Sequence, residues 1–574
     1  MAEGRCGRRV SGEGEVDGTA ATSRWTMHWA EVGVFDANAA ALGIDAADLM
    51  AAAGAALAGQ AIHMIRAAAD GLLPDRPVWI LCGPGNNGGD GFACALGLID
   101  EGLDVLLQCS HAVQKGETAQ MFRDRCREAG LVEESWPLTL AGRKPCLVID
   151  CLLGAGVSSG SDSGGGSAAT RPLRGAVAQV VGWIGDSAPR APVLACDGPT
   201  GLGTEDVLVA DATVTFHAEK MGLRLNGSPA PGVGNLHIAS LPWPEQVADC
   251  GPGDALRYPA LDADARKGDR GRVMVVGGGP YHGAPLLAGV AAARVGCDLV
   301  HVAMPSDAAA RAEWPASLIP ESLPDADILT LGSVEVIEGR LRRGRGCQAM
   351  LIGPGLGRDE ATVAAVRELL HRAVRLGIPT VVDADAVAAL PEAAWPDGLI
   401  GVATPHSREA AGWLGDVSPA AALDGPLTVS AGVESDESSD AGREIAEVMG
   451  GLELDAGPEA GHAVDAGPES IAVVVTGPTD HLYGSGGRRA KATGGHPRMA
   501  VGGTGDLLAG IITGLLAQGM PAWPAARLGC ALLRTAGAAA AVRYGPGLLA
   551  ADVPPHIAET LAAWLPTAAD ATDE

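Results

Sequence analysis

The stretch GPGNNGGDG at residues 83–91 decides the fold of the first half of the chain. It directly follows the apolar run 78–82 and directly precedes the apolar run 92–96, so it predicts a strand, a tight glycine turn and the start of a helix. Free backbone N–H groups and the helix dipole attract a phosphate to such a turn. The spacing is not that of the strict dinucleotide fingerprint, but two asparagines and an aspartate add polar groups that a plain connecting loop does not need.

The composition is that of an acidic, globular chain with more than one domain. Its 574 residues are too many for one core, and 47% hydrophobic with 19% charged residues is typical of globular proteins. The formal charge of -28 lacks the basic footprint that nucleic acids and anionic membranes attract. We therefore expect neither a nucleic-acid nor a membrane partner.

The cysteines and the N-terminus favour a cytoplasmic location. The 12 cysteines are scattered singly, without the spacing of a zinc ribbon or a disulfide framework. No apolar stretch reaches the roughly 18 residues that a membrane-spanning helix needs. Residues 1–27 are polar and lack the apolar region of a signal peptide, so we expect a disordered tail there.

Apolar runs of strand length alternate with helical stretches along the whole chain. After helices between 34 and 68, the first half has strand-like runs at 78–82, 105–108, 146–151, 193–196, 212–216 and 236–238, and a helix at 118–129. The second half has them at 271–276, 299–303, 349–352, 380–383, 399–403 and 471–476, with helices at 506–518 and 525–542. This alternation predicts two α/β domains with parallel sheets.

Breaks in the pattern give the domain bounds. We expect a tail at 1–27, a first domain at 28–243, a linker at 244–265 and a second domain at 266–566. Residues 431–470 are acidic and rich in Gly, Pro and Ser, a composition that cannot bury a core and predicts a flexible insert. The Ser/Gly-rich tract 158–167 predicts a smaller insertion in a surface loop.

Polar residues follow three strands of the first half. Asp150 and Asp197 each end an apolar run and precede a glycine turn, and Thr200 lies in the second turn. An aspartate in such a place is more often a turn or cap residue. Ligands of open parallel sheets, however, bind beyond the carboxyl ends of the strands, where these side chains would meet Asn87. Such oxygen ligands suit a hard cation, and the loop amides suit a phosphate.

The first half resembles the NAD(P)H-hydrate epimerase family, of the YjeF N-terminal type. The elements that carry the resemblance are 42–44, 49–50, 83–91, 150–156, 197–201, 210–216, Lys220 and 222–223. It implies a potassium ion held by Asn87, Asp150 and Thr200, with Asp150 as a catalytic residue. It also implies contacts to the hydrated nicotinamide nucleotide from Asn86, Asn87, Gly88, Gly89, Asp90, Gly154, Ala155, Gly156, Val157, Ser158, Ser159, Gly160 and Asp197. Ala51 and Ala52 depart from the Glu-Asn pair of many relatives.

The second half carries its most specific signal at 502–506, Gly-Gly-Thr-Gly-Asp, which opens an apolar helix. The amides of residues 503–506 predict an anion hole for a transferring phosphoryl group. Asp506 in the first turn could accept the proton of an attacking hydroxyl. Taken alone, Asp506 could equally be an ordinary helix-start residue, and His406, after another strand, an ordinary loop histidine.

This half resembles the ribokinase-like ADP- or ATP-dependent NAD(P)H-hydrate dehydratase family. The matching elements are 267–268, 271–273, 283–285, 353–357, 383–386, 404–406 and 502–506. The resemblance implies that the hydrate is faced by Ala284, Gly355, His406 and the catalytic Asp506. It implies that ADP or ATP, with Mg²⁺ on the phosphates, is faced by Thr476, Gly477, Pro478, Thr479, Asp480 and Gly505. Relatives commonly carry lysine where this chain has Thr476, so one positive charge on the phosphates is missing.

The two families are known as a fused pair in this order. The resemblance implies a Rossmann-like three-layer domain followed by a ribokinase-like α/β domain, in a homo-oligomer. It implies epimerisation of the R and S forms of hydrated NADH or NADPH, then dehydration of the S form. Two alternatives stay open: a small-molecule kinase that releases a phosphorylated product, and a first domain that is only a binding module. The presence of Asn87, Asp90, Asp150 and Asp197 argues against the binding module.

Overall fold

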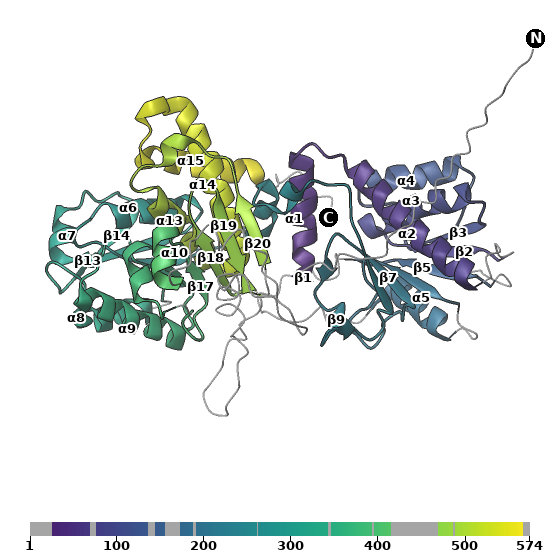
Figure 1. Ribbon diagram of the computed structural model, residues 1–574, viewed down its shortest axis with the longest axis horizontal. Coiled ribbons are helices and arrows are strands. Elements are labelled where there is room, and N and C mark those ends of the chain that lie inside the picture. The colour runs from purple at the N-terminus through teal and green to yellow at the C-terminus, as the bar shows by residue number, and fades with distance from the viewer. Residues whose placement is uncertain are drawn as a thin grey trace, which may run out of the picture.

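The computed structural model describes residues 26–68, 76–135, 144–154, 173–186, 191–260, 262–342, 346–392, 395–414, 469–485 and 488–565. They form two α/β domains that lie next to each other along the long axis (Figure 1). The expected tail 1–27 lies outside the described residues except for its last two, and so does the tract 158–167. The expected insert 431–470 lies outside them except for residues 469 and 470.

The first domain is built on a seven-stranded sheet of order β11-β7-β6-β5-β2-β3-β4, in which every neighbouring pair is parallel. Its strands are β2 (Val78–Cys82), β3 (Val105–Cys109), β4 (Val132–Ser135), β5 (Leu147–Cys151), β6 (Val193–Cys196), β7 (Ala212–Phe216) and β11 (Asn235–Ala239). The six strands expected in this half are all present, which confirms the parallel α/β prediction.

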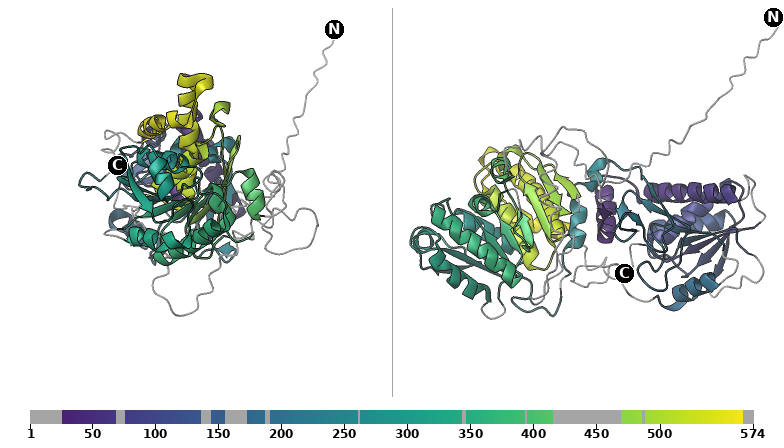
Figure 2. Two further views of the ribbon diagram at one scale, coloured as in Figure 1. Left: turned by 90° about the vertical axis from the view of Figure 1, so that its left-hand side faces the viewer. Right: turned by 60° about the horizontal axis from the view of Figure 1, so that its bottom comes forward.

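Helices cover both faces of this sheet, as Figure 2 shows. Alternate residues of a strand point to opposite faces. Val78 and Ile80 of β2 pack among the helices α2 (Ala46–Ala68), α3 (Asn86–Asp100) and α4 (Glu117–Glu128). Trp79 and Leu81 pack on the other face against α5 (Gly175–Asp186). The uninterrupted apolar run at 78–82 therefore reflects burial on both faces, and the domain has the predicted three layers.

The second domain has a nine-stranded sheet of order β14-β13-β12-β15-β16-β17-β18-β19-β20. Its strands are β12 (Arg272–Val276), β13 (Leu299–Pro305), β14 (Leu318–Leu323), β15 (Ala349–Ile352), β16 (Thr380–Val382), β17 (Gly401–Ala403), β18 (Ile471–Val475), β19 (Asp480–Gly484) and β20 (Arg488–Ala492). Val273 and Val275 face α6 (Ala284–Arg294), α13 (Thr504–Ala517) and α14 (Ala522–Tyr544). Met274 and Val276 face α8 (Leu331–Arg342), α9 (Glu360–Leu376) and α10 (Ser407–Leu414).

Four strands of the two large sheets were not predicted from the sequence: β4, β14, β19 and β20. The last two also run antiparallel to their neighbours, so this sheet is mixed rather than parallel throughout. In β20 exposed and buried residues alternate, Arg489 and Lys491 facing outward. A strand with one solvent-exposed face alternates polar and apolar residues. It therefore lacks the continuous apolar run from which the buried strands were predicted.

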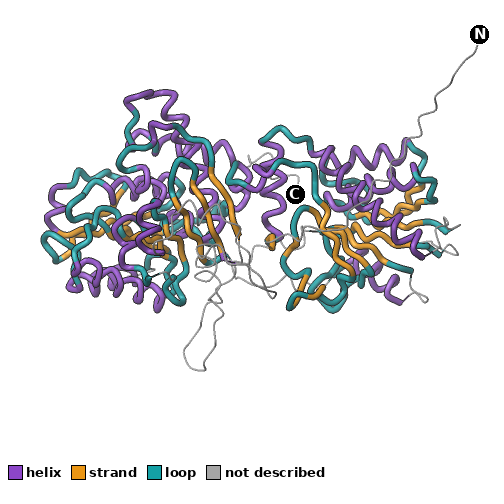
Figure 3. The backbone as a smooth tube through the Cα atoms, viewed as in Figure 1, coloured by secondary structure: helices purple, strands orange, loops and turns teal. Residues whose placement is uncertain are grey.

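The segment between the domains is folded rather than a bare connection. It forms the 3-10 helices η2 (Glu245–Ala248) and η3 (Pro252–Arg257), which pack on α1 (Trp29–Ala41) at the start of the first domain. Figure 3 shows helical segments at the place where the two domains meet. Asn38 of α1 donates from Nδ2 to the carbonyl oxygens of Val247, at 3.2 Å, and Asp249, at 3.1 Å.

Two helical stretches, Ala46–Ala68 and Ala522–Gly547, are long and apolar enough to cross a membrane by length and composition alone. Of their most apolar windows, 44% and 78% respectively are buried inside the protein. Core helices of soluble domains meet the same two criteria, and α14 lies in the core of the second domain.

Candidate active sites

The glycines of the loop at 83–91 are required by close packing of the chain. A Cβ atom on Gly83 would lie 1.8 Å from the carbonyl oxygen of Leu152, and one on Gly88 would lie 2.1 Å from that of Gly83. The turn therefore sits against the end of β5, and α3 begins directly after Gly85. No side chain caps this helix, so its first N–H groups stay available to a ligand.

Asp150 and Thr200 form a buried pair at the ends of β5 and β6. Oδ1 of Asp150 accepts from the Thr200 hydroxyl at 2.7 Å, and Oδ2 accepts from the Thr200 backbone N–H at 2.8 Å. Asp150 is 0% exposed, and burial raises its pKa to about 6, although the Thr200 hydrogen bonds oppose the shift. The hydroxyl of Thr200 also accepts from the backbone N–H of Leu153 at 3.2 Å.

Asn87 lies on the other side of the same turn. A Cβ atom on Gly154 would lie 3.1 Å from Oδ1 of Asn87, so the turn after β5 packs directly on this amide. Nδ2 of Asn87 is buried and has no hydrogen-bond partner among the described residues. The structure thus gathers Asn87, Asp150 and Thr200 around residues 152–154, as the sequence predicted for three strand ends.

Asp197 is bound to a buried lysine. Nζ of Lys220 donates to Oδ1 of Asp197 at 2.7 Å, to the Thr215 hydroxyl at 3.0 Å and to the Phe216 carbonyl at 2.6 Å. Both side chains are buried, Lys220 being 2% exposed. Asp197 has a backbone φ of 62°, a left-handed conformation that aspartate tolerates better than most residues and that is concentrated at functional sites.

Two further carboxylates face Asp197. Burial and then the charges of Asp197 and Asp36 raise the pKa of Asp90 well above its ordinary value. Asp36 comes from α1, is exposed, and adds its charge to this cluster. Asp90 and Asp197 were predicted from the sequence as residues of this site. No function was predicted for Lys220, and Asp36 was not predicted at all. The predicted contacts Ala155, Gly156, Val157, Ser158, Ser159 and Gly160 lie outside the described residues.

In the second domain the motif at 502–506 opens α13. The N-cap Gly503 has a φ of 101° and provides no side-chain cap. Cβ atoms on Gly502 and Gly505 would meet no atom within 4 Å, so both border open space in front of the helix start. Asp506 is half-buried, and burial followed by the charge of Asp385 raises its pKa to about 6.

The neighbouring strand ends contribute the rest of this site. Oδ2 of Asp385 accepts from the Gly357 N–H at 2.9 Å, which ties the end of β16 to the glycine turn after β15. Asp383 is buried and accepts from the Thr404 hydroxyl at 2.8 Å. Burial and then the charge of Asp506 raise the pKa of Asp383 well above its ordinary value. Gly355 packs so closely that a Cβ atom would lie 2.1 Å from the Tyr281 carbonyl oxygen.

The predicted hydrate contact His406 and the predicted nucleotide loop 476–480 lie side by side. His406 is exposed and pairs with Thr476 through an isolated parallel bridge, while its Nδ1 accepts from the N–H groups of Arg408 and Glu409 at the start of α10. Ala284 is the first residue of α6, directly after the turn that follows the carboxyl end of β12. The structure therefore places the predicted histidine beside the predicted nucleotide loop 476–480.

That loop is organised by Arg534 of α14, which the sequence reading missed. Its guanidinium donates to Asp480 at 2.8 Å, to the Pro478 carbonyl at 2.6 Å and to the Gly477 carbonyl at 2.7 Å. Asp480 is only 4% exposed and also accepts from the Gly477 N–H at 3.1 Å. The Asp480 carboxylate therefore shapes the loop, whereas residues 476–479 are exposed or half-exposed.

Comparison with known proteins agrees with this geometry. The family model of the YjeF-related protein N-terminus matches residues 46–222, and the model of NAD(P)H-hydrate dehydratase matches residues 273–458 and 463–559. The bifunctional NAD(P)H-hydrate repair enzyme Nnr of Hyperthermus butylicus is 31% identical over 92% of this chain and 91% of its own. The enzyme of the same name from Methanopyrus kandleri is 30% identical over 86% of this chain and 89% of its own.

Among solved structures, the ADP/ATP-dependent NAD(P)H-hydrate dehydratase from Bacillus subtilis, co-crystallised with ATP/Mg²⁺, is similar to the second domain. It is 21% identical, with a TM-score of 0.38, over 55% of this chain and 96% of its own. The two family models together match most of both domains, and the relatives are matched over nearly their whole length. The chain therefore belongs to the family of bifunctional NAD(P)H-hydrate repair enzymes.

Proposed function

We propose that this chain repairs hydrated NADH and NADPH in two steps. The first domain interconverts the R and S epimers of the hydrate, and the second dehydrates the S epimer at the expense of ADP or ATP. One observation carries the proposal: α3 and α13 both begin at a glycine N-cap without a side-chain cap, beyond the carboxyl edge of a sheet and beside partly buried carboxylates. Each is a place for a phosphate-bearing substrate next to proton-transfer groups.

In the first domain, the loop 86–90, Gly154 and Asp197 would contact the hydrate. A potassium ion would be held by oxygens of Asn87, Asp150 and Thr200. The amide of Asn87 fits this role because its buried Nδ2 lacks a partner among the described residues, and turning the amide over presents its oxygen at the same point. When bound, the ion would add a positive charge that holds the substrate phosphate or ring.

In the second domain, Asp506 would accept the proton of the C6 hydroxyl as that oxygen attacks the terminal phosphate of the nucleotide. The N–H groups of residues 503–505 would stabilise the transferring phosphoryl group. The resulting phosphate ester is a far better leaving group than hydroxide, and its elimination restores the reduced nicotinamide ring. Ala284, Gly355 and His406 would face the hydrate, and residues 476–480 with Gly505 the nucleotide.

Magnesium would enter this second site on the phosphates of the nucleotide. Among the described residues no group of three or more His, Cys, Asp or Glu side chains could hold a metal ion by itself. Mg²⁺ in phosphoryl-transfer sites is held mainly by the substrate phosphates, waters and one or two carboxylates, which fits such a sparse set. The charge of the magnesium ion would neutralise the phosphates, because Thr476 provides no positive charge there.

We further propose that the enzyme works in the cytoplasm, as a homo-oligomer whose substrates are only small molecules. Every cysteine in the described part of the chain is a free thiol, and most are buried, which suits a reducing compartment. Sedimentation of the purified protein tests the oligomeric state.

The test of the function is a reaction of the full chain with a mixture of both hydrate epimers of NADH. With ADP or ATP and Mg²⁺, all of the hydrate should return to NADH, with one nucleotide consumed per NADH. Without nucleotide, the epimers should interconvert and no NADH should form. A stable phosphorylated product without NADH would instead identify a small-molecule kinase. If only the S epimer returned to NADH and the R epimer stayed unchanged, the result would contradict epimerisation.

A further inference from the structure

Lys220 stands apart from the other lysines of this chain. The lysines are Lys115, Lys144, Lys220, Lys267 and Lys491. Four of them are exposed, and Lys220 alone is buried. Arginine provides the cation in the buried pairs of Arg527 with Asp254 and of Arg534 with Asp480. An ammonium at this one position points to a compact point charge that serves Asp197.

The hydrogen bonds around Asp197 divide its two oxygens between different tasks. Oδ1 accepts from Nζ of Lys220 at 2.7 Å, from the Thr215 hydroxyl at 2.9 Å and from the Phe216 N–H at 3.5 Å. Among the residues that the structure describes, Oδ2 accepts no hydrogen bond. The carboxylate is thus held on one side and bears an open oxygen on the other, which is the arrangement of an oriented base.

The backbone fixes this arrangement from both ends. The Asp197 N–H donates to the Val214 carbonyl at 2.7 Å, and the next N–H, of Gly198, donates to the Cys196 carbonyl at 2.7 Å. Lys220 is fixed by β8 (Glu219–Lys220), which pairs with β1 (Thr26–Met27), Met27 lying opposite Lys220. The main chain of both residues is therefore held by neighbouring strands and turns.

Asp90 faces Asp197 in a contrasting environment. It lies one turn into α3, half-buried, with Oδ2 4.0 Å from Sγ of Cys196, which directly precedes Asp197. Besides Cys196 at the end of β6 and Asp197 directly after it, Asp90 is faced by Asp36 from α1, Lys220 from β8 and Cys94 of its own helix. Burial and two neighbouring carboxylates raise the pKa of Asp90, whereas Asp197 is held in an ion pair with the ammonium of Lys220. Two carboxyl groups in such different surroundings can act as acid and base.

We propose that Asp197 is the base and Asp90 the acid of the epimerisation, and that Lys220 is the residue that positions Asp197. This rests on the proposed epimerase activity. Asp197 removes the proton of the C6 hydroxyl while the bond between C6 and N1 breaks. The electron pair of that bond goes to N1, and N1 takes the proton of Asp90. The product is an open-chain aldehyde with an N–H at N1.

The reverse steps complete the epimerisation without a further reactant. Rotation about the bond between C5 and C6 presents the other face of the aldehyde to N1. N1 then attacks C6 and returns its proton to Asp90, while the new hydroxyl takes its proton from Asp197. Both carboxyl groups recover their starting states, and only the configuration at C6 has changed.

The test compares variants of the full chain by the rate at which the two epimers interconvert without nucleotide. Wild-type protein must epimerise, since its failure would overturn the proposed function and not this assignment. Asp197→Asn and Asp90→Asn should each lose about 10²–10⁴-fold in kcat. Glu101→Gln removes an exposed carboxylate that pairs with Arg66 at the far end of α3, outside this cluster, and should stay within a few-fold of wild type. Nucleotide-dependent dehydration of the S epimer by each variant reports that the protein is folded.

Two substitutions of Lys220 separate positioning from proton transfer. Lys220→Met should lower kcat with little change in KM, because Asp197 then loses the ammonium that holds its Oδ1. Lys220→Arg keeps a charged donor at this place and should restore much of the rate. A Lys220→Arg enzyme as slow as Lys220→Met would overturn the positioning role, and a fully active Asp90→Asn enzyme would overturn the acid assignment.

Discussion

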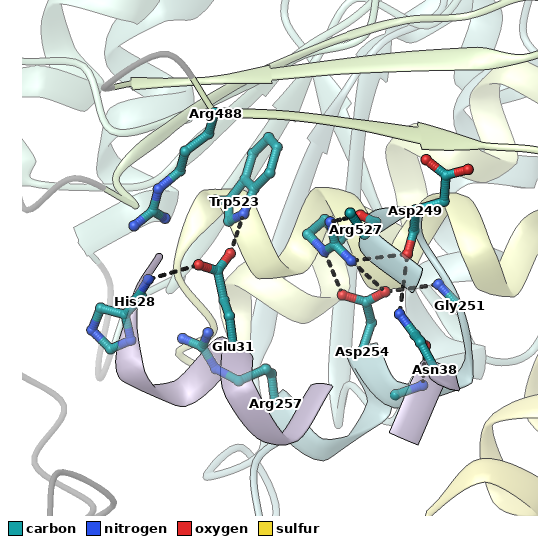
Figure 4. A network of polar contacts seen from close by, with 12 residues as sticks. His28, Glu31, Asn38, Asp249, Gly251, Asp254, Arg257, Arg488, Trp523 and Arg527 are labelled. Carbon is teal, nitrogen blue, oxygen red and sulfur yellow. Dashed lines mark hydrogen bonds and ion pairs between the residues drawn. The ribbon is translucent and has the colours of Figure 1, made fainter. Parts of the chain in front are cut away.

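Trp523 of α14 donates its indole N–H to the carboxylate of Glu31 on α1 at 2.8 Å, a hydrogen bond between residues 492 positions apart. The bond joins the start of the first domain to the core of the second (Figure 4). The same face holds the buried ion pair of Arg527 with Asp254, at 2.6 Å, and the pair of Arg257 with Glu469, at 2.9 Å. Arg488 adds a second ion pair to Glu469 at 3.2 Å. The two domains are therefore joined by buried polar contacts.

The first prediction concerns the stability of this interface. Asp254→Asn should destabilise the protein by about 3–5 kcal/mol, because it leaves the buried guanidinium of Arg527 without its counter-ion. Arg66→Ala, which removes an exposed ion pair with Glu101, should cost no more than about 1 kcal/mol. Thermal unfolding of both variants checks the contrast. Equal melting temperatures would show that the interface contributes little to stability.

The second prediction concerns the insert. Replacing residues 431–466 by a short Gly/Ser linker should leave the dehydration rate nearly unchanged. Replacing 431–470 also removes Glu469 and should lower the melting temperature, because Arg257 and Arg488 then lose a buried partner. A large fall in kcat with the shorter replacement, in protein that melts normally, would show that the insert acts in catalysis.

The same carboxylate predicts a dependence of stability on pH. Burial alone would raise the pKa of Glu469, but Arg257 and the other neighbouring cations lower it to about 2. A lowered pKa stabilises the folded protein above the ordinary value of 4.5 and ceases to do so as the pH falls toward 2. Glu469→Gln should therefore flatten the acid limb of the melting-temperature curve. An unchanged acid limb would contradict the ion pairs.

The fourth prediction concerns the cation site of the first domain. Epimerisation by the full chain should require potassium, with Asp150→Ala and Thr200→Ala losing most of the rate and its dependence on potassium. Thr200→Ser keeps the hydroxyl that bonds Asp150 and should retain both. The rate is measured in potassium, sodium and lithium salts at constant ionic strength. Wild-type epimerisation by Asp150→Ala would show that the site lies elsewhere.

The fifth prediction concerns Asp506. Asp506→Asn should lose about 10²–10⁴-fold in kcat for dehydration while it still binds nucleotide and epimerises the hydrate. Because a base must be ionised and the pKa of Asp506 is about 6, the wild-type rate should fall as the pH drops through 6. Asp385→Asn removes the charge that helps to raise this pKa, so the acid limb should move to lower pH. Dehydration at the full rate without nucleotide would remove the kinase-like mechanism.

Local signals in the sequence were sufficient for much of this structure. The buried strands, exemplified by Val78–Cys82, show as apolar runs because helices cover both faces of the sheet. The turn glycines show because a Cβ atom on Gly83 would overlap the neighbouring chain. Asp150 and Thr200 were foreseeable together, since parallel strands bring their carboxyl ends to one edge.

Only the tertiary structure decided which side chains from other parts of the chain meet the site residues. Sequence patterns report the burial of a residue, but they do not say which charged side chain will meet it. Lys220 meets Asp197 only when the turn after β6 and the strand β8 come together in the fold. Arg534 meets Asp480 only because α14 packs on the strands β18, β19 and β20. The exposed Asp36 shows the same limit, since only the packing of α1 brings it to face Asp197. The sequence by itself determined the two domains and the edges that carry their sites, because those depend on local periodicity and on turn geometry. The protonation states and supports of the site residues depend on burial and on charges far away in the chain, and only the folded structure brings these together.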